Sequence, residues 1–130
     1  MAIVYLSLGS NKGDRIGYVQ QATSLIGALD NVNIIRTSAF YESEPWGMAS
    51  ETWFVDAVVE IKTSLSPREL LEACRRIETQ LGRERDESKE GYLDRTIDID
   101  ILFYGKEIIN EPDLVIPHKY LHLRAFTLVP

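Results

Sequence analysis

Two aspartates stand two positions apart in an apolar segment near residue 100. The segment reads Ile97-Asp98-Ile99-Asp100-Ile101. Because strand side chains alternate between two faces, we expect the isoleucines to point into a core and both aspartates to share the opposite face. Such carboxylates repel one another unless a cation lies between them, and Mg²⁺ commonly takes one or two carboxylates plus substrate phosphates. The pair therefore indicates a metal and polyphosphate site, with a solvated polar strand face as the plain alternative.

Three arginines flank the aspartate segment. Gly82-Arg83-Glu84-Arg85 follows a predicted helix, and Arg95 lies three residues before Asp98. Arginine presents forked donors that match phosphoryl oxygens and stays charged at any working pH, and phosphoryl-type transfer depends mainly on electrostatic stabilisation. Taken singly, each arginine is better explained as part of a solvated loop. As a set beside the aspartates, they favour a triphosphate site.

The segment around residue 55 offers a different kind of surface. If the aliphatic residues from Val55 to Ile61 face the core, Phe54 and Asp56 lie on the same face as the aspartate pair. An aromatic plane beside a hydrogen-bond acceptor fits a flat heterocycle with N–H donors. Trp46, in the preceding loop, adds a second possible stacking surface. The alternative for each of these residues is local packing or solvation.

Other catalytic arrangements find no support in the sequence. Cys74 lies on an apolar helix face, and together with His118 and His122 it supplies neither a nucleophile set nor a zinc framework. No Walker-type glycine loop occurs, so ATP would be held by side chains and metal. His118, Arg124 and Phe126, taken one by one, are more often structural than functional.

Hydrophobic periodicity defines the elements that must position these residues. The sequence predicts a helix after the N-cap Asp14, and the capping box Ser66-Pro67-Arg68-Glu69 predicts a second helix that ends near Gly82. Strands are expected over residues 2–8, 32–41, 53–63 and 97–104, then a tight turn at 105–106, a short partner strand over 107–109 and a helix over 118–128. This order predicts an α+β fold of the split βαβ type, with both helices on one face of an antiparallel sheet. The long loops 42–52 and 83–96 are candidate lids.

Length and composition narrow the class of protein. The chain has 130 residues, 45% of them hydrophobic and 26% charged, which is typical of one globular domain. Its 14 Lys and Arg against 20 Asp and Glu give a net charge of −6, which disfavours broad nucleic-acid binding. The single cysteine and the short apolar start, which has no basic segment before it, predict a cytoplasmic protein that does not enter a membrane.

Several segments, in order along the chain, resemble the 6-hydroxymethyl-7,8-dihydropterin pyrophosphokinase family of folate biosynthesis. They are Leu8-Gly9-Ser10-Asn11, Phe40-Tyr41, Gly82-Arg83-Glu84-Arg85, Arg95-Thr96-Ile97-Asp98-Ile99-Asp100-Ile101-Leu102, Pro117-His118 and Arg124-Ala125-Phe126. The resemblance implies a ferredoxin-like fold with the active site on the sheet face opposite the helices. It also implies transfer of the β,γ-pyrophosphoryl unit of ATP to the pterin hydroxymethyl group, with AMP leaving.

The same resemblance implies a role for each matching residue. Asp98 and Asp100 would bind two Mg²⁺ ions, with Asp98 also near the acceptor hydroxyl, and Arg83 and Arg95 would stabilise charge on the transferring group. The remaining positions divide between the substrates: Arg85, His118 and Arg124 would hold the triphosphate, Glu78 and Ile99 would line the nucleotide pocket, and Phe54, Phe126, Asp56, Ser43, Glu44 and Trp46 would bind the pterin.

Three departures from the family pattern stand out. Gly91-Tyr92-Leu93-Asp94 precedes Arg95 where the family usually has Trp-Gly-Pro-Arg, which leaves Tyr92 as the candidate replacement for the loop tryptophan. Asp56 stands where asparagine is common, which keeps the acceptor and loses an amide donor. The sequence given ends at Pro130, so we expect residues 1–130 to be a single pterin pyrophosphokinase domain without the family's usual C-terminal stretch.

Two rival functions use the same architecture. An RNA-recognition module would place aromatics on the central strands but would need a positive field, whereas this chain has a net charge of −6 and an aspartate pair there. A regulatory domain would keep the pterin or nucleotide pocket without catalysis. We expect the enzyme, acting as a monomer on ATP and the pterin, with no nucleic-acid or membrane partner.

Overall fold

The structure is a computed structural model that describes residues 1–43, 53–82 and 96–117. Its elements, in chain order, are β1 (Ala2–Ser10), α1 (Arg15–Gly27), β2 (Val32–Thr37), β3 (Tyr41–Ser43), β4 (Phe54–Thr63), α2 (Pro67–Gln80), β5 (Asp98–Tyr104), β6 (Ile109–Glu111) and β7 (Leu114–Ile116). The predicted alternation of strands and helices up to residue 104 is confirmed.

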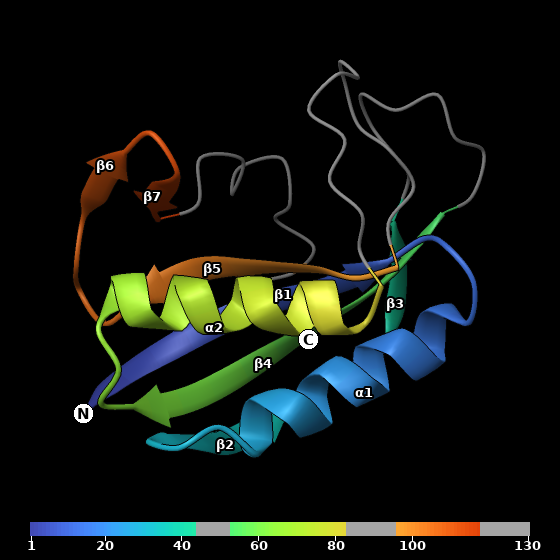
Figure 1. The fold of residues 1–130 in the computed structure, drawn as a ribbon, viewed down its shortest axis with the longest axis horizontal. Coiled ribbons are helices and arrows are strands. Elements are labelled where there is room, and N and C mark those ends of the chain that lie inside the picture. The colour runs from blue at the N-terminus through green and yellow to red at the C-terminus, as the bar shows by residue number, and fades with distance from the viewer. Residues whose placement is uncertain (44–52, 83–95, 118–130) are drawn as a thin grey trace.

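The main sheet is antiparallel, with β1 and β4 at its centre. Its strand order is β2-β4-β1-β5, and β3 pairs with β4 beyond the end of β2. Both helices cover one face, with α2 against β5 and α1 against β1 and β4 (Figure 1). This is the predicted α+β, ferredoxin-like arrangement, and it leaves the opposite face of β4, β1 and β5 for a site.

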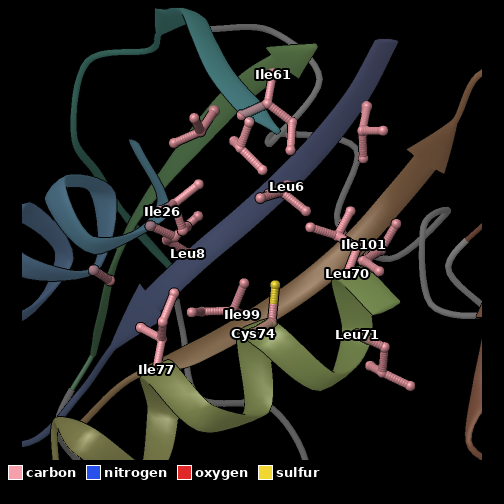
Figure 2. Packing of buried hydrophobic residues seen from close by; sticks show 14 of the residues in the cluster. Leu6, Leu8, Ile26, Ile61, Leu70, Leu71, Cys74, Ile77, Ile99 and Ile101 are labelled. Carbon is pink, nitrogen blue, oxygen red and sulfur yellow. The ribbon is translucent and has the colours of Figure 1, made fainter. Parts of the chain in front are cut away.

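The core lies between the helices and the sheet. Leu6 and Leu8 of β1 and Ile99 of β5 are essentially inaccessible to solvent, and the apolar face of α2 packs onto them. Figure 2 shows Cys74 and Ile77 pointing from α2 toward this strand pair. Burying one such side chain stabilises the folded state by roughly 1.5–3 kcal/mol. This layer therefore holds β1 and β5 together on the helix-covered face of the sheet.

The sequence signals at the ends of both helices are confirmed. The Asp14 carboxylate accepts a hydrogen bond from the Gly17 N–H at the start of α1. Ser66 and Glu69 exchange the two hydrogen bonds of a capping box, with Pro67 at the first helical position of α2. Gly82 follows α2 with φ of +90°, a backbone conformation that side chains disfavour, so glycine suits the end of this helix.

Two strand predictions were wrong in their bounds. The first strand does not end at Leu8, because Gly9 and Ser10 pair with Asp56 and Val55 of β4. Residues 32–41 are not one strand: β2 ends at Thr37, and a separate β3 begins at Tyr41. Between them the Ser38 N–H and hydroxyl bond the backbone of Val58, so the chain stays beside β4 although it leaves the ladder.

The short strand predicted over residues 107–109 as a partner of β5 was also wrong. β6 instead pairs with β7, joined through Pro112-Asp113, and the two form a separate hairpin beside β5. The helix predicted over 118–128 lies outside the described residues. In the portions that the structure describes, neither helix is long and apolar enough to cross a membrane.

Candidate active site

The sheet register aligns two acidic side chains across one glycine. Gly9 of β1 pairs with Asp56 on one side and with Asp98 on the other. Neighbouring strands lie about 4.8 Å apart, so the backbones of the two aspartates are roughly 10 Å apart. Residues paired across antiparallel strands share a face, which places Asp56 and Asp98 on the side of the sheet away from the helices. The predicted common face is therefore present.

Gly9 is the residue that lets Asp56 occupy its position. A Cβ atom built on Gly9 would lie 2.5 Å from Asp56 Oδ1 and 3.3 Å from Phe54 Cδ1, both on side chains of this face. The first distance is far shorter than atoms in contact allow. Gly9 therefore provides space beside the Phe54–Asp56 surface that any other residue would fill.

The face is buried rather than solvated. Asp56 is 3% exposed, Asp98 6% and Phe54 7%. Ser7 lies two residues before Gly9 on β1 and pairs with Asp100 of β5. It is also buried, and its hydroxyl has no hydrogen-bond partner among the described residues. Because charged groups are seldom buried without a partner, these values exclude a fully solvated position for Asp56 and Asp98.

Asp56, Gly9 and Asp98 form a row across three strands, called the acidic row below. Tyr41 lies next to the Asp56 end of this row. It pairs with Asp56 across β3 and β4. Burial, reinforced by the negative charge of Asp56, raises the pKa of Tyr41 to about 12. The Tyr41 phenol therefore stays protonated at neutral pH, beside a carboxylate.

Behind the site, α2 is bonded to the outer edge of β5. The Glu78 side chain is 1% exposed, and one of its oxygens accepts the Ile99 N–H at 2.8 Å. Its other oxygen accepts from Arg75 at 2.9 Å, while Arg75 also donates to the Ile99 carbonyl at 3.2 Å. Both edge groups of Ile99 are thus satisfied by the helix, and the Ile99 side chain lies in the core.

A cavity of about 150 Å³ opens on this edge of the sheet. It is lined by Leu71 and Arg75 of α2, Asp100 and Ile101 of β5, and Pro112, Asp113, Leu114 and Val115 of the hairpin. Burial works to lower the pKa of Arg75, but the charges of Glu78, Asp100 and Asp98 outweigh it and the pKa is raised. A permanent cation therefore lies at the cavity wall, within the field of the aspartate pair.

The donor chemistry of the aspartate pair suits a hard cation. Residues 1–43, 53–82 and 96–117 contain no group of three or more His, Cys, Asp or Glu side chains that could by itself enclose a metal. Mg²⁺ does not need one, since it keeps waters and takes substrate phosphates alongside one or two carboxylates. Asp98 and Asp100 on one face, with Asp100 at the cavity wall, fit Mg²⁺ bound together with a polyphosphate.

The structure brings part of the predicted site together. Phe54, Asp56 and Asp98 are buried on the common face, Asp100 lies beside them, and the backbone of Ser43 pairs with Phe54. Glu78 and Ile99 bond each other behind the cavity instead of appearing in its lining. The predicted residues that lie outside the described parts of the chain are Arg83, Arg85, Arg95, His118, Arg124, Glu44, Trp46, Tyr92 and Phe126.

The sequence patterns described above predict no role for three residues of the site, which are Gly9, Tyr41 and Arg75. Gly9 carried a signal, because a glycine inside a strand pattern marks a close approach. In the sequence, Tyr41 stands out only within the Phe40-Tyr41 segment. Its position beside Asp56 follows from the pairing of β3 with β4. Arg75 looks like any exposed helix residue in the sequence, and only the packing of α2 on β5 reveals its contacts.

Comparison with known proteins identifies the family. Residues 5–130 match the family described as 7,8-dihydro-6-hydroxymethylpterin-pyrophosphokinase. A 2-amino-4-hydroxy-6-hydroxymethyldihydropteridine pyrophosphokinase of Bacillus subtilis (strain 168) is 43% identical over 128 residues, which cover 98% of this chain and 75% of that protein. A protein of the same name from Methylorubrum extorquens is 40% identical over 130 residues, covering 100% of this chain and 80% of the relative.

A solved structure supports the fold independently. The crystal structure of an HPPK-DHPS in complex with substrates matches with a TM-score of 0.68 at 15% identity, covering 98% of this chain and 39% of that one. At this identity the likeness concerns the fold alone. With the family match over nearly the whole sequence, the chain belongs to the 7,8-dihydro-6-hydroxymethylpterin-pyrophosphokinase family.

Proposed function

We propose that this chain transfers the β,γ-diphosphate of ATP to the hydroxymethyl group of 6-hydroxymethyl-7,8-dihydropterin and releases AMP. Its family makes it a pyrophosphokinase of folate biosynthesis. The observation that supports the proposal best is the row Asp56–Gly9–Asp98, because it puts an acceptor for a flat heterocycle and a candidate metal ligand on one buried face, roughly 10 Å apart at the backbone. Two substrates lying along this row would meet between the two carboxylates.

The pterin would occupy the β4 side of the row. Phe54 offers a ring face for stacking, and the Asp56 carboxylate can accept from the N–H groups at one edge of a pterin. Ser43 lies opposite Phe54 at the end of β3, so the loop that follows it starts beside this surface. Glu44, Trp46 and Phe126 complete the pterin set that we propose.

The nucleotide would occupy the β5 side of the row. The cavity beside Asp100 has about 150 Å³, less than the roughly 300–1,000 Å³ of pockets that enclose a whole small molecule, so it suits one portion of ATP. Arg75 and the edge of β5 at Ile101 border it, while Glu78 and Ile99 support it from behind. Arg85, His118 and Arg124 are the residues that we propose for the triphosphate.

Asp98 and Asp100 would hold the two Mg²⁺ ions of the proposal. Bound there with the triphosphate, Mg²⁺ would neutralise phosphoryl charge and help to orient the phosphates. Two observations support a polar ligand on this face: the Asp98 carboxylate is buried there, and the Ser7 hydroxyl has no hydrogen-bond partner among the described residues.

In the proposed reaction the main contribution of this chain is to align the two substrates. The hydroxymethyl oxygen forms a bond to the β-phosphorus, the bond from that phosphorus to the α,β-bridging oxygen breaks, AMP departs with that oxygen, and the hydroxyl proton passes to water. Asp98 stands nearest the acceptor in our assignment, and Arg83 and Arg95 stabilise charge on the transferring group. Positioning two reactants in this way removes much of the entropic barrier.

We also propose that the chain acts as a cytoplasmic monomer. The buried, free thiol of Cys74 suits a reducing compartment. Light scattering on the purified chain, with and without both substrates, tests the monomer directly.

Product analysis tests the proposed reaction. The chain is incubated with Mg-ATP and 6-hydroxymethyl-7,8-dihydropterin, and AMP is resolved from ADP, with pterin-free and Mg²⁺-free incubations as controls. We expect AMP in amounts equal to the pterin diphosphate, and neither in the controls. ADP as the product, or no turnover by a folded chain that binds both substrates, would contradict the proposal and favour a regulatory binding domain.

A further inference from the structure

The β6–β7 hairpin lies outside the main sheet. It forms its own two-stranded sheet, and Figure 1 shows it beside β5, near the start of α2. Leu114 and Ile116 are buried in the core, whereas Glu111, Pro112 and Asp113 at the turn are exposed. Strand β7 is therefore anchored by packing, and the position of the turn depends on other contacts.

Arg68 supplies those contacts from the first turn of α2. Its Nη1 donates to Asp113 Oδ2 at 2.6 Å, and its Nη2 donates to Glu111 Oε2. The guanidinium thus bonds both ends of the hairpin turn with its two terminal nitrogens, a geometry that lysine cannot reproduce. The bond from Arg68 also holds the pKa of the Asp113 carboxyl below its ordinary value, which keeps this acceptor charged.

Helix stability does not explain an arginine at this position. The N-terminus of a helix carries a partial positive charge, so a cation in the first turn is unfavourable there while acidic groups are favourable. Glu69, one residue later, fits that rule. The Arg68 side chain is 41% exposed and bonds the two hairpin carboxylates, so a role in holding the hairpin accounts for it better.

The hairpin turn that Arg68 holds is also a wall of the cavity beside Asp100. Pro112, Asp113, Leu114 and Val115 form one side of it, and Leu71 and Arg75 of α2 form another. Leu71 and Arg75 lie one and two helical turns after Arg68. A second, more open hollow next to it is lined by Arg68, Arg75 and Asp113, among others, so the ion pairs stand at the rim. The distance between α2 and the hairpin therefore sets the width of the cavity.

We propose that Arg68 is a positioning residue for the nucleotide: by bonding Glu111 and Asp113 it holds the hairpin against α2 and keeps the cavity beside Asp100 at the width that ATP requires. This inference rests on the proposed function, which places part of ATP in that cavity. Arg68 acts through the hairpin, so it influences ATP affinity and leaves the chemical step unchanged.

Steady-state kinetics of Arg68→Gln test the inference. Exposed ion pairs are individually weak, so we expect the KM for ATP to rise about three- to tenfold, with kcat and the KM for the pterin within twofold of the unchanged chain. Asp113→Asn should act in the same direction, and the double variant should be no worse than Arg68→Gln, because Arg68→Gln already breaks the contact that Asp113→Asn removes. Arg68→Lys, which keeps the charge but loses the fork, should fall between Arg68→Gln and the unchanged chain.

A matched control and a readout other than activity complete the test. Arg36→Gln removes another arginine–carboxylate pair, Arg36 to Glu60 at 2.5 Å, on β2 away from the hairpin, and should leave every kinetic constant unchanged. Hydrogen exchange of the amides of residues 109–116 should be faster in Arg68→Gln and should slow when Mg-ATP is added.

The outcomes separate this inference from the proposed function. An unchanged KM for ATP and unchanged hairpin exchange in a folded Arg68→Gln chain would overturn the role of Arg68, while AMP release by the unchanged chain would leave the proposed function standing. A loss of kcat instead of ATP affinity would also overturn it. If the unchanged chain neither binds Mg-ATP nor releases AMP, both proposals fail together.

Discussion

At the scale of a single residue, Gly9 leaves the space that the Asp56 carboxylate occupies. Its φ lies outside the left-handed region, so the backbone itself tolerates alanine, but the added Cβ would lie 2.5 Å from Asp56 Oδ1. We expect Gly9→Ala to fold, to displace Asp56, and to raise the KM for the pterin at least about tenfold, equivalent to about 1.4 kcal/mol of binding. Initial-rate kinetics with varied pterin at saturating ATP measure this.

Ser7→Ala is the matched control for that change. Ser7 lies two positions earlier on the same strand and face, and its hydroxyl bonds no described residue. Its removal should leave the KM for the pterin within twofold. An equal effect of both variants would show that general disturbance of β1, and not the space at Gly9, governs pterin binding.

Tyr41 makes the folded state sensitive to alkaline pH. Its pKa is about 12 in the folded protein, raised by burial and by Asp56, against the ordinary value of 10.0 in an unfolded chain. Between these values the unfolded chain has released a proton that the native protein keeps, so the free energy of unfolding falls as the pH rises through 10. We expect Tyr41→Phe to lose less stability than the unchanged chain between pH 9.5 and 11, as measured by urea unfolding. Parallel stability curves would contradict this account of Tyr41.

At the scale of elements, one buried side chain joins α2 to the edge of β5. Glu78→Ala leaves the Ile99 N–H without its acceptor and Arg75 without its carboxylate. Leaving a buried donor unsatisfied costs about 1–3 kcal/mol, so the free energy of unfolding should fall by that amount. Glu78→Gln can still accept from Ile99 and should lose less. Urea denaturation of both variants measures the difference, and equal losses would assign the effect to the ion pair with Arg75 instead.

The elements differ in how well their sequences predict them. The start of α2 is encoded locally, since Ser66, Pro67 and Glu69 make their contacts within one turn. The hairpin was misplaced because the tight turn at Gly105-Lys106 favoured a partner for β5, although Pro112-Asp113 between two short apolar runs is itself a turn signal. The break between β2 and β3 depends on Ser38 bonding Val58, a contact between segments 20 residues apart that no local pattern reveals.

The same distinction holds for the candidate site. Side chains alternate between the two faces of a strand, so the sequence of β4 and β5 alone predicts which residues share a face. This predicted the common face of Phe54, Asp56 and the aspartate pair. The row Asp56–Gly9–Asp98 could not be predicted, since it depends on the register of three strands. The bonds of Arg75 and Glu78 depend on how α2 packs across β5, which is decided by the whole core.

At the scale of the whole molecule, Cys74 reports on opening of the core. It is the chain's single cysteine, it is buried between α2 and β5, and burial, with a smaller contribution from Glu78, raises the pKa of its thiol to about 12. Both effects suppress reaction with a thiol reagent until the core opens. We expect labelling of the native chain at neutral pH to be at least about 1,000-fold slower than in concentrated urea, since opening of a core costs several kcal/mol. Labelling at a rate near that of the unfolded chain would show that α2 is not packed as described.

In the proposed reaction, Asp98 and Asp56 act on the two substrates from opposite sides of Gly9. The most direct test is the rate of pterin-dependent AMP formation by Asp98→Asn, which keeps the side-chain shape and removes the charge that would hold the metal. We expect a loss of about 10²–10³-fold in kcat in a chain that unfolds at its usual temperature and still binds the pterin. AMP formation at the unchanged rate would contradict it, because the acidic row would then have no part in the transfer.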